Sequence, residues 1–225
     1  MNRKTPLDVI VVGGGIAGMA CAMELTTQAQ AVDRPVRIRI IAKEPVSVSN
    51  SYAAQGGMAA VLHPADTTAR HVHDTITVGE GRNDPSVVRR VVREGPDVVR
   101  ALLNMGAAFD INEVGELALG REGGHTIARV VPHLDRTGAE IVRVLQRRVR
   151  TTPGISVLDE QAVDLLVEGN RCTGIRTRDP RTGFFTDRFA HVVVLATGGA
   201  GQVYLHTTNP PGATGDGIAM ALRAN

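Results

Sequence analysis

The residues with the clearest chemical potential form a glycine-rich hexapeptide near the N-terminus, Gly13-Gly14-Gly15-Ile16-Ala17-Gly18. Glycine occupies its first, third and sixth positions, which is the G-x-G-x-x-G spacing of dinucleotide-binding turns. A backbone without side chains can turn tightly and approach a pyrophosphate, and a helix that follows offers free N–H groups and the positive end of its dipole. The hexapeptide therefore predicts a dinucleotide site, and a plain tight turn is the alternative.

The elements around this hexapeptide have the order that such a site requires. Leu7 to Val12 is a mostly apolar, β-branched run, which predicts a buried parallel strand. Ile16 to Gln30 predicts a helix, and the alternating run Val36 to Ala42 predicts a second strand. The chain from Lys43 to Gly57 has too few apolar residues for a strand. We therefore expect a βαβ unit at the start of the chain.

Two further helices are predicted in the middle of the chain. Asp84 to Gly106 looks helical, with Asp84 or Ser86 as the N-cap and Gly106 at its end. Pro96 is expected to break or kink this helix. Asp135 to Arg150 predicts another helix, with basic residues in its last turns.

The last third of the chain predicts strands. Short strand-like runs occupy Ile155 to Leu158, Ala162 to Val167, Cys172 to Arg178 and Phe184 to Phe189. The apolar run Val192 to Ala196 predicts another buried parallel strand, and it leads into Thr197-Gly198-Gly199. Together these runs predict an α/β fold, a Rossmann-like doubly wound sheet with an antiparallel β insertion.

Two polar segments leave the identity of the dinucleotide open. Where an acidic residue normally ends the second strand and binds ribose hydroxyls, this chain has Ala42-Lys43, and Lys43 is only a donor. This departure leaves FAD and NAD both open. A second small-residue loop suits either the polar edge of a flat ring or an ordinary glycine turn, and it contains Asn50, Ser51, Tyr52, Ala53, Ala54, Gln55, Gly56 and Gly57.

Composition restricts the other classes of function. The net charge of +2 gives no electrostatic case for nucleic-acid binding, and no apolar stretch is long enough to span a bilayer. Cys21 and Cys172 fit no metal or redox spacing, so we read them as reduced thiols of a cytoplasmic protein. His71 and His73 lack a second cluster that would complete a metal site. The arginine clusters predict solvated helix faces, with a docking face for an acidic partner as the alternative.

Seven motifs in a fixed order carry a resemblance to a known family. They are the glycine hexapeptide, Ala53-Ala54-Gln55-Gly56-Gly57, Arg121-Glu122-Gly123-Gly124-His125, Asp135-Arg136-Thr137-Gly138, Ala196-Thr197-Gly198-Gly199-Ala200, Thr207-Thr208-Asn209-Pro210 and Gly215-Asp216-Gly217. Over essentially its full length the chain resembles the flavoprotein family of succinate dehydrogenase, fumarate reductase and L-aspartate oxidase. The resemblance implies that residues 1–225 are the N-terminal part of an FAD-binding domain, ending before the capping and C-terminal helical domains.

The resemblance also implies roles for individual residues. FAD would be non-covalent, because Asn50 stands where the respiratory enzymes carry the histidine that attaches the flavin. Glu122, where the succinate enzymes carry Gln, would orient the ammonium group of an amino-acid substrate, and a solvated surface carboxylate is the alternative. His125 would line the active site or be a buried, satisfied histidine. Further FAD contacts would come from Gly198, Gly199, Asp216, and the backbone of Ala162 and Val163.

The reaction implied is the oxidation of L-aspartate to iminoaspartate, with reoxidation by oxygen or fumarate. It is the first step toward quinolinate and NAD, with quinolinate synthase as a partner. The carboxylate-binding histidines and arginines of the family lie downstream, so we expect residues 1–225 alone to be inactive. A soluble succinate or fumarate enzyme is the first alternative, because Asp135-Arg136-Thr137-Gly138 reads closer to that branch. A non-catalytic FAD-binding module is the second.

Overall fold

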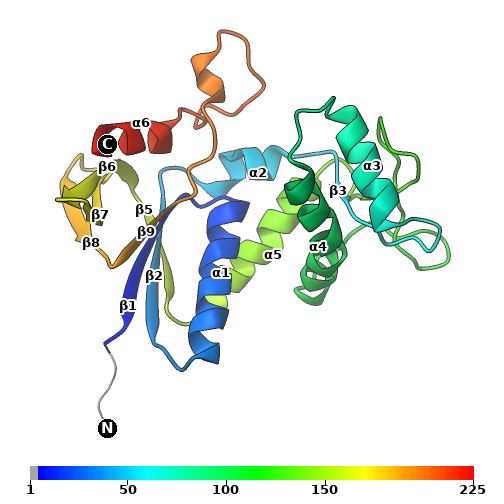
Figure 1. Cartoon of the computed structure of the whole chain (residues 1–225). Helices are drawn as coiled ribbons and strands as arrows, with labels where there is room; N and C mark the ends of the chain where they lie inside the picture. Colours follow the sequence, from blue (N-terminus) through cyan, green and yellow to red (C-terminus); the bar gives the residue numbers. More distant parts are fainter. Residues whose placement is uncertain (1–4) are drawn as a thin grey trace. The chain divides into compact units, whose positions relative to one another are not determined.

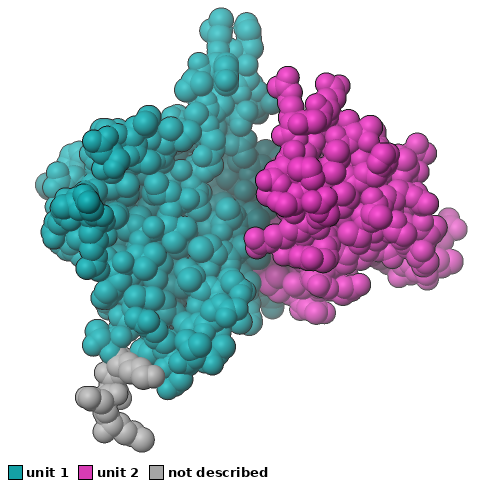
Figure 2. Space-filling view, viewed as in Figure 1, with its two compact units in different colours: residues 1–53, 145–225 teal, residues 54–144 magenta. Residues whose placement is uncertain are grey.

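The computed structural model describes residues 5–225, which form two compact units. The first unit combines the described chain up to Ala53 with Leu145–Asn225, and the second is Ala54–Val144 (Figure 2). Because two distant stretches of sequence meet in the first unit, the second unit is an insertion into it along the chain. The helix α5 (Thr137–Thr151) begins in the second unit and ends in the first.

A four-stranded parallel sheet forms the centre of the first unit, in the order β5-β2-β1-β9. Its strands are β1 (Leu7–Val12), β2 (Val36–Ala42), β5 (Ile155–Asp159) and β9 (Val192–Leu195). The helix α1 (Ile16–Ala31) connects β1 to β2 and packs against both of them (Figure 1). The βαβ unit expected from the sequence is therefore confirmed, and both of its strands have the predicted bounds.

An antiparallel sheet of three strands follows β5 in the chain, in the order β6-β7-β8. It consists of β6 (Gln161–Glu168), β7 (Arg171–Arg178) and β8 (Phe185–Phe189), as the short strand-like runs predicted. The last element is the helix α6 (Asp216–Ala224), after a 3-10 turn at Gly201–Val203. The predicted α/β fold with an antiparallel insertion is confirmed.

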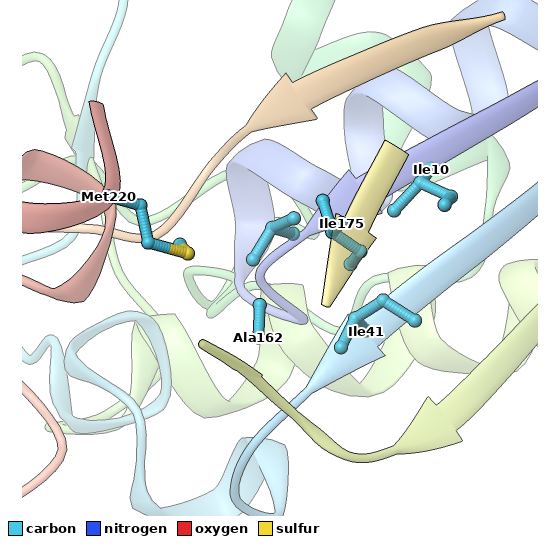
Figure 3. Close-up of a cluster of buried hydrophobic side chains, with 6 residues drawn as sticks. Ile10, Ile41, Ala162, Ile175 and Met220 are labelled. Atoms are coloured by element: carbon cyan, nitrogen blue, oxygen red, sulfur yellow. The ribbon is translucent and has the colours of Figure 1, made fainter. Parts of the chain in front are cut away.

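One hydrophobic cluster of the first unit lies where the parallel sheet, the antiparallel sheet and α6 meet (Figure 3). Ile10 and Val12 alternate along β1, so both side chains point to the same face of the sheet. On that face they join a buried cluster that also contains Ile41, Ala162, Ile175 and Met220. The antiparallel sheet and α6 thus cover one face of the parallel sheet. The helix α1 packs against β1 and β2 of the same parallel sheet.

The second unit contains two whole helices, the start of α5 and one pairing of two short strands. The helices are α3 (Thr68–Val78) and α4 (Pro85–Asn104), and β3 (Met58–Ala59) pairs antiparallel with β4 (Val130–Val131). Asp84, one of the two N-cap candidates, caps α4 by accepting hydrogen bonds from the N–H groups of Ser86 and Val87. The helix α3 was not predicted, although Thr67 is its N-cap and accepts from the Arg70 N–H.

The structure rules out a helix break at Pro96, one of the two alternatives expected there, and it corrects the expected burial of β9. Pro96 does not break α4, because the helix continues on both sides of it. Its ring removes only one main-chain donor, and the helix keeps its packing through the buried Val92, Val99 and Leu102. The strand β9 is only half-buried, because it lies at the edge of the sheet, with Val192 42% exposed and Leu195 38% exposed.

Candidate FAD site and substrate loop

The glycine hexapeptide forms the turn between β1 and α1, as its spacing predicted. Gly13 has a φ of +120°, and a Cβ atom there would lie 2.1 Å from the carbonyl oxygen of Ala196. A Cβ atom at Gly18 would lie 1.9 Å from the carbonyl oxygen of Gly13, so the first turn of α1 packs directly on the loop. The first and sixth glycines are therefore required by the backbone, for the turn and for the close packing of the helix.

The N-terminus of α1 is open to an anion. Its N-cap is Gly15, which has no side chain to accept a hydrogen bond, and the first turn contains no acidic residue. The N–H of Ile16 donates to Ser51 Oγ at 3.2 Å, which brings the short helix α2 (Asn50–Ala53) to this end. The positive end of the helix dipole thus has no carboxylate beside it in its own first turn. This arrangement fits a pyrophosphate.

Lys43 and Asp216 form an ion pair at the ends of β2 and α6. The Lys43 Nζ lies 2.8 Å from Asp216 Oδ2 and 2.7 Å from Thr214 Oγ1, and Thr214 donates to Asp216 Oδ1 at 2.7 Å. Burial alone would raise the pKa of the Asp216 carboxyl, but the hydrogen bonds from Lys43 and Thr214 hold it below its ordinary value. Asp216 is thus a carboxylate able to accept hydrogen bonds from hydroxyl groups.

The glycines after β9 lie beside this pair. Gly198 has a φ of +73°, and Cβ atoms built at Gly198 and Gly199 would meet nothing within 4 Å. The Gly215 N–H donates to the Gly199 carbonyl at 3.2 Å, and Gly217 packs against Thr197. The turn after β9 is therefore joined to the N-terminus of α6. The structure brings together the ends of β1, β2 and β9, where the predicted cofactor residues Gly13 to Gly18, Lys43, Gly198, Gly199 and Asp216 gather.

The other predicted cofactor residues lie in two further places. Ala162 is buried in the core, so only its backbone is available to a ligand. Val163 sits where the β6–β7 register shifts, and its carbonyl accepts from Arg223 Nη2 at 2.7 Å. The loop after α2 belongs to the second unit from Ala54 onward. There the carbonyls of Ala54 and Gln55 accept from Gly138 N–H and Thr137 Oγ1, and the stretch Ala53 to Gly57 is exposed.

Glu122 and His125 lie on one tight loop of the second unit. The side chain of Glu122 is exposed, and its carbonyl accepts from the His125 N–H at 3.1 Å. The His125 ring stands edge-to-face on His71, with 5.9 Å between their centroids, and both Nδ1 atoms are buried without a hydrogen-bond partner. Burial and the nearby Arg129 lower the pKa of His71, so its imidazole is neutral at neutral pH.

A buried ionic cluster beneath this loop was missed by the sequence reasoning. Arg129, whose side chain is fully buried, donates to both oxygens of Asp66 at 2.8 and 3.0 Å and to Asp74 Oδ2 at 2.6 Å. One signal was present in the sequence, because an arginine flanked by Ala128 and Val130 in an apolar run needs a partner if it is buried.

Other candidate ligands do not assemble into a metal site. Among residues 5–225, no three His, Cys, Asp or Glu side chains are grouped so as to hold a metal ion. Cys21 and Cys172 are both free and half-buried. Within the same residues, no helix combines the length and the apolar character needed to cross a membrane.

A parallel sheet whose carboxyl edge gathers a glycine turn, an uncapped helix N-terminus and a hydrogen-bonded carboxylate defines a dinucleotide-binding domain. The chain belongs to the FAD-binding domain family, whose family model matches residues 8–225. This membership decides between the two dinucleotides that the spacing left open, and the cofactor is FAD. The glycines that leave room for a close approach and the ionised Asp216 fit such a ligand.

The chain is similar to named relatives over nearly all of its length. It is 42% identical to the chloroplastic L-aspartate oxidase of Arabidopsis thaliana, over 96% of this chain and 33% of that protein. It is 38% identical to the L-aspartate oxidase of Bacillus subtilis, over 100% of this chain and 40% of that protein. A variant of E. coli quinol fumarate reductase has a TM-score of 0.88 at 32% identity, covering 98% of this chain and 37% of that one. The chain therefore spans 33% to 43% of the length of its curated relatives.

Proposed function

We propose that the protein oxidises L-aspartate to iminoaspartate. The observation that carries this proposal is the similarity to L-aspartate oxidases at 38% to 43% identity over at least 96% of the chain. Conversion of the amine to the imine removes two electrons and two protons from the substrate. Bound FAD supplies the two-electron acceptor for this step. Passing the electrons to oxygen gives hydrogen peroxide, and passing them to fumarate gives succinate.

The residues of this chain would hold the cofactor without a covalent bond. The N-terminus of α1 would bind the pyrophosphate. The Asp216 carboxylate would accept hydrogen bonds from the ribityl hydroxyls, and Lys43 would keep Asp216 ionised and oriented. Asn50, in α2, has an amide side chain, which cannot form the histidine linkage of the respiratory relatives. Acid precipitation of the purified protein should therefore release all of the flavin into the supernatant.

Glu122 would select an amino acid as the substrate. Its exposed carboxylate can pair with an ammonium group, which succinate and fumarate lack. His125 is placed on the same loop, but its ring faces His71, so we assign it to the support of the loop. The imine product is unstable, so we expect quinolinate synthase to consume it as a partner.

The first test is anaerobic reduction of the flavin in the full-length protein. L-Aspartate should bleach the flavin absorbance, and succinate at the same concentration should leave it unchanged. The second candidate function, a soluble succinate or fumarate enzyme, is favoured by the similarity to quinol fumarate reductase at a TM-score of 0.88. Bleaching by succinate alone would replace the first proposal with the second, and Glu122 would then need another role.

A further inference from the structure

The loop Arg121 to Thr126 is attached to a single buried carboxylate. Asp74 lies in the last half of α3, and its side chain is 3% exposed. Its Oδ2 atom accepts from the Thr126 N–H at 2.9 Å and from Thr126 Oγ1 at 2.8 Å. The same oxygen accepts from Arg129 Nη1 at 2.6 Å. Asp74 Oδ2 therefore contacts both Thr126, at the end of the loop, and Arg129, three residues further along the chain.

The carboxylate itself has little freedom to move. Arg129 is held on its other side by two hydrogen bonds to Asp66, whose side chain is fully buried. Burial alone would raise the pKa of Asp74, but the hydrogen bonds from Thr126 and Arg129 hold it well below its ordinary value. Asp74 is therefore ionised at neutral pH. Asp74 Oδ2 accepts from three donors, and one of them belongs to Arg129, which is itself fixed by its bidentate pair with Asp66. These contacts define the position of the Asp74 carboxylate closely.

The rest of the loop is tied down around Glu122. The Gly120 N–H donates to the Val130 carbonyl at 2.8 Å, and the Arg129 N–H donates to the Gly120 carbonyl at 2.9 Å, so the base of the loop is closed. Arg121 Nε donates to the His125 carbonyl at 2.9 Å. Gly124 has a φ of +82°, and a Cβ atom there would lie 2.3 Å from Val78 Cγ2 at the end of α3. Within this framework the Glu122 side chain is exposed and can meet a ligand.

We propose that Asp74 is a positioning residue for substrate recognition, which holds the loop through Thr126 so that the Glu122 carboxylate is fixed where it meets the ammonium group of the substrate. This inference rests on the proposed function and adds to it a residue that does not touch the substrate. Asp74 acts on Glu122 only through the conformation of the loop. Loss of the Asp74–Thr126 link should thus reduce amino-acid selectivity and leave reactions of substrates without an ammonium group nearly unchanged.

The experiment uses Thr126→Val in the full-length protein with bound FAD, because Asp74→Asn leaves the buried Arg129 with one carboxylate and endangers folding. The quantity measured is kcat/KM for L-aspartate divided by kcat/KM for fumarate reduction. This ratio is compared between the native protein and three variants, namely Glu122→Gln, Thr126→Val and the double variant. Thr126→Ser keeps the hydroxyl. Thr77→Val is the matched control, because Thr77 is exposed on the same helix as Asp74 and its hydroxyl donates to the His73 carbonyl within that helix.

The expected result is a ratio lowered about fivefold in Thr126→Val, the usual size of one lost hydrogen bond. Thr126→Ser and Thr77→Val should keep the original ratio, and Thr126→Val should cause no further loss in the Glu122→Gln background. Amide hydrogen exchange from Glu122 to His125 should become faster in Thr126→Val, with or without substrate.

Two outcomes would overturn the inference while Glu122 keeps its role. One is a lower thermal midpoint in Thr126→Val with an unchanged ratio, which would mean that the link only stabilises the fold. The other is an additive loss in the double variant, which would mean that Thr126 acts elsewhere than through Glu122. If Glu122→Gln itself leaves the ratio unchanged, the proposed role of Glu122 fails first, and the inference fails with it.

Discussion

At the scale of single residues, the proposed cofactor site contains an ion pair between Lys43 and Asp216. Lys43 stands where many dinucleotide-binding domains carry an acidic residue, and its ammonium group contacts Asp216 and Thr214. Two of its three donors are thereby used within the protein. Its main effect is on Asp216, which it keeps ionised although that residue is partly buried.

This relation makes the binding of FAD depend on pH in a specific way. In Lys43→Met the pKa of Asp216 should rise, because burial is then opposed by the hydrogen bond from Thr214 and no longer by Lys43. FAD affinity should fall about tenfold at neutral pH, as expected for one charge-assisted contact. As the pH is lowered, the variant should lose FAD at a higher pH than the native protein.

A fluorescence titration with FAD between about pH 3 and pH 7 measures this dependence, because that range contains the ordinary Asp pKa of about 3.9. Lys43→Arg, which keeps a cation near Asp216, should behave like the native protein. Equal pH profiles for Lys43→Met and the native protein would show that Asp216 does not need its ion pair.

At the scale of elements, the glycine turns divide into those required by the backbone and those open to a ligand. Gly13 faces the Ala196 carbonyl, whereas Gly199 has open space where a side chain would stand. Sequence spacing located both turns, because the short apolar strands β1 and β9 are each followed within three residues by glycine. It did not show which glycine is required for folding, because that depends on contacts between segments about 180 residues apart.

The two alanine substitutions should therefore separate stability from cofactor binding. Gly13→Ala should lower the free energy of unfolding by about 3 kcal/mol or more, from a strained φ and a backbone clash. Gly199→Ala should leave the stability of the FAD-free protein unchanged and weaken FAD binding at least tenfold, because the added methyl group occupies space kept for the dinucleotide. Urea denaturation and FAD titration provide the two measurements.

Gly123→Ala provides the control for Gly199→Ala, because its Cβ atom would also meet nothing within 4 Å and it is not one of the predicted cofactor residues. It should affect neither the stability nor the affinity for FAD. Unaltered FAD binding in Gly199→Ala would remove the turn after β9 from the cofactor site.

At the scale of the whole molecule, the buried cluster of Asp66, Asp74 and Arg129 should make the thermal stability of the protein depend on pH. The pKa values of both carboxyls are lowered in the folded protein, so the folded state binds fewer protons than the unfolded state near pH 4. The stabilisation is fully present above the ordinary carboxyl pKa, and it is lost as the pH falls through and below that value. The thermal midpoint should therefore decrease steeply below about pH 4.

Asp74→Asn tests this origin of the acid sensitivity. Wherever the variant folds, its thermal midpoint at pH 7 should be lower than that of the native protein, and the two curves should converge toward about pH 3. Asp97→Asn is the control, because its side chain is 82% exposed and its pair with Arg100 lies on the surface. Parallel curves for Asp74→Asn and the native protein would assign the acid sensitivity to other carboxylates.

The sequence by itself determined the βαβ unit, the glycine turn between its first strand and its helix, and the antiparallel insertion, because each depends on local periodicity and on glycines at fixed spacing. The tertiary structure decided which of these residues meet. It brings Lys43 into contact with Asp216, which is 173 residues away in the sequence, and it shows that α4 continues through Pro96. It also placed Arg129 between Asp66 and Asp74, since burial and ion pairing between distant segments follow from packing and leave no periodic pattern in the chain.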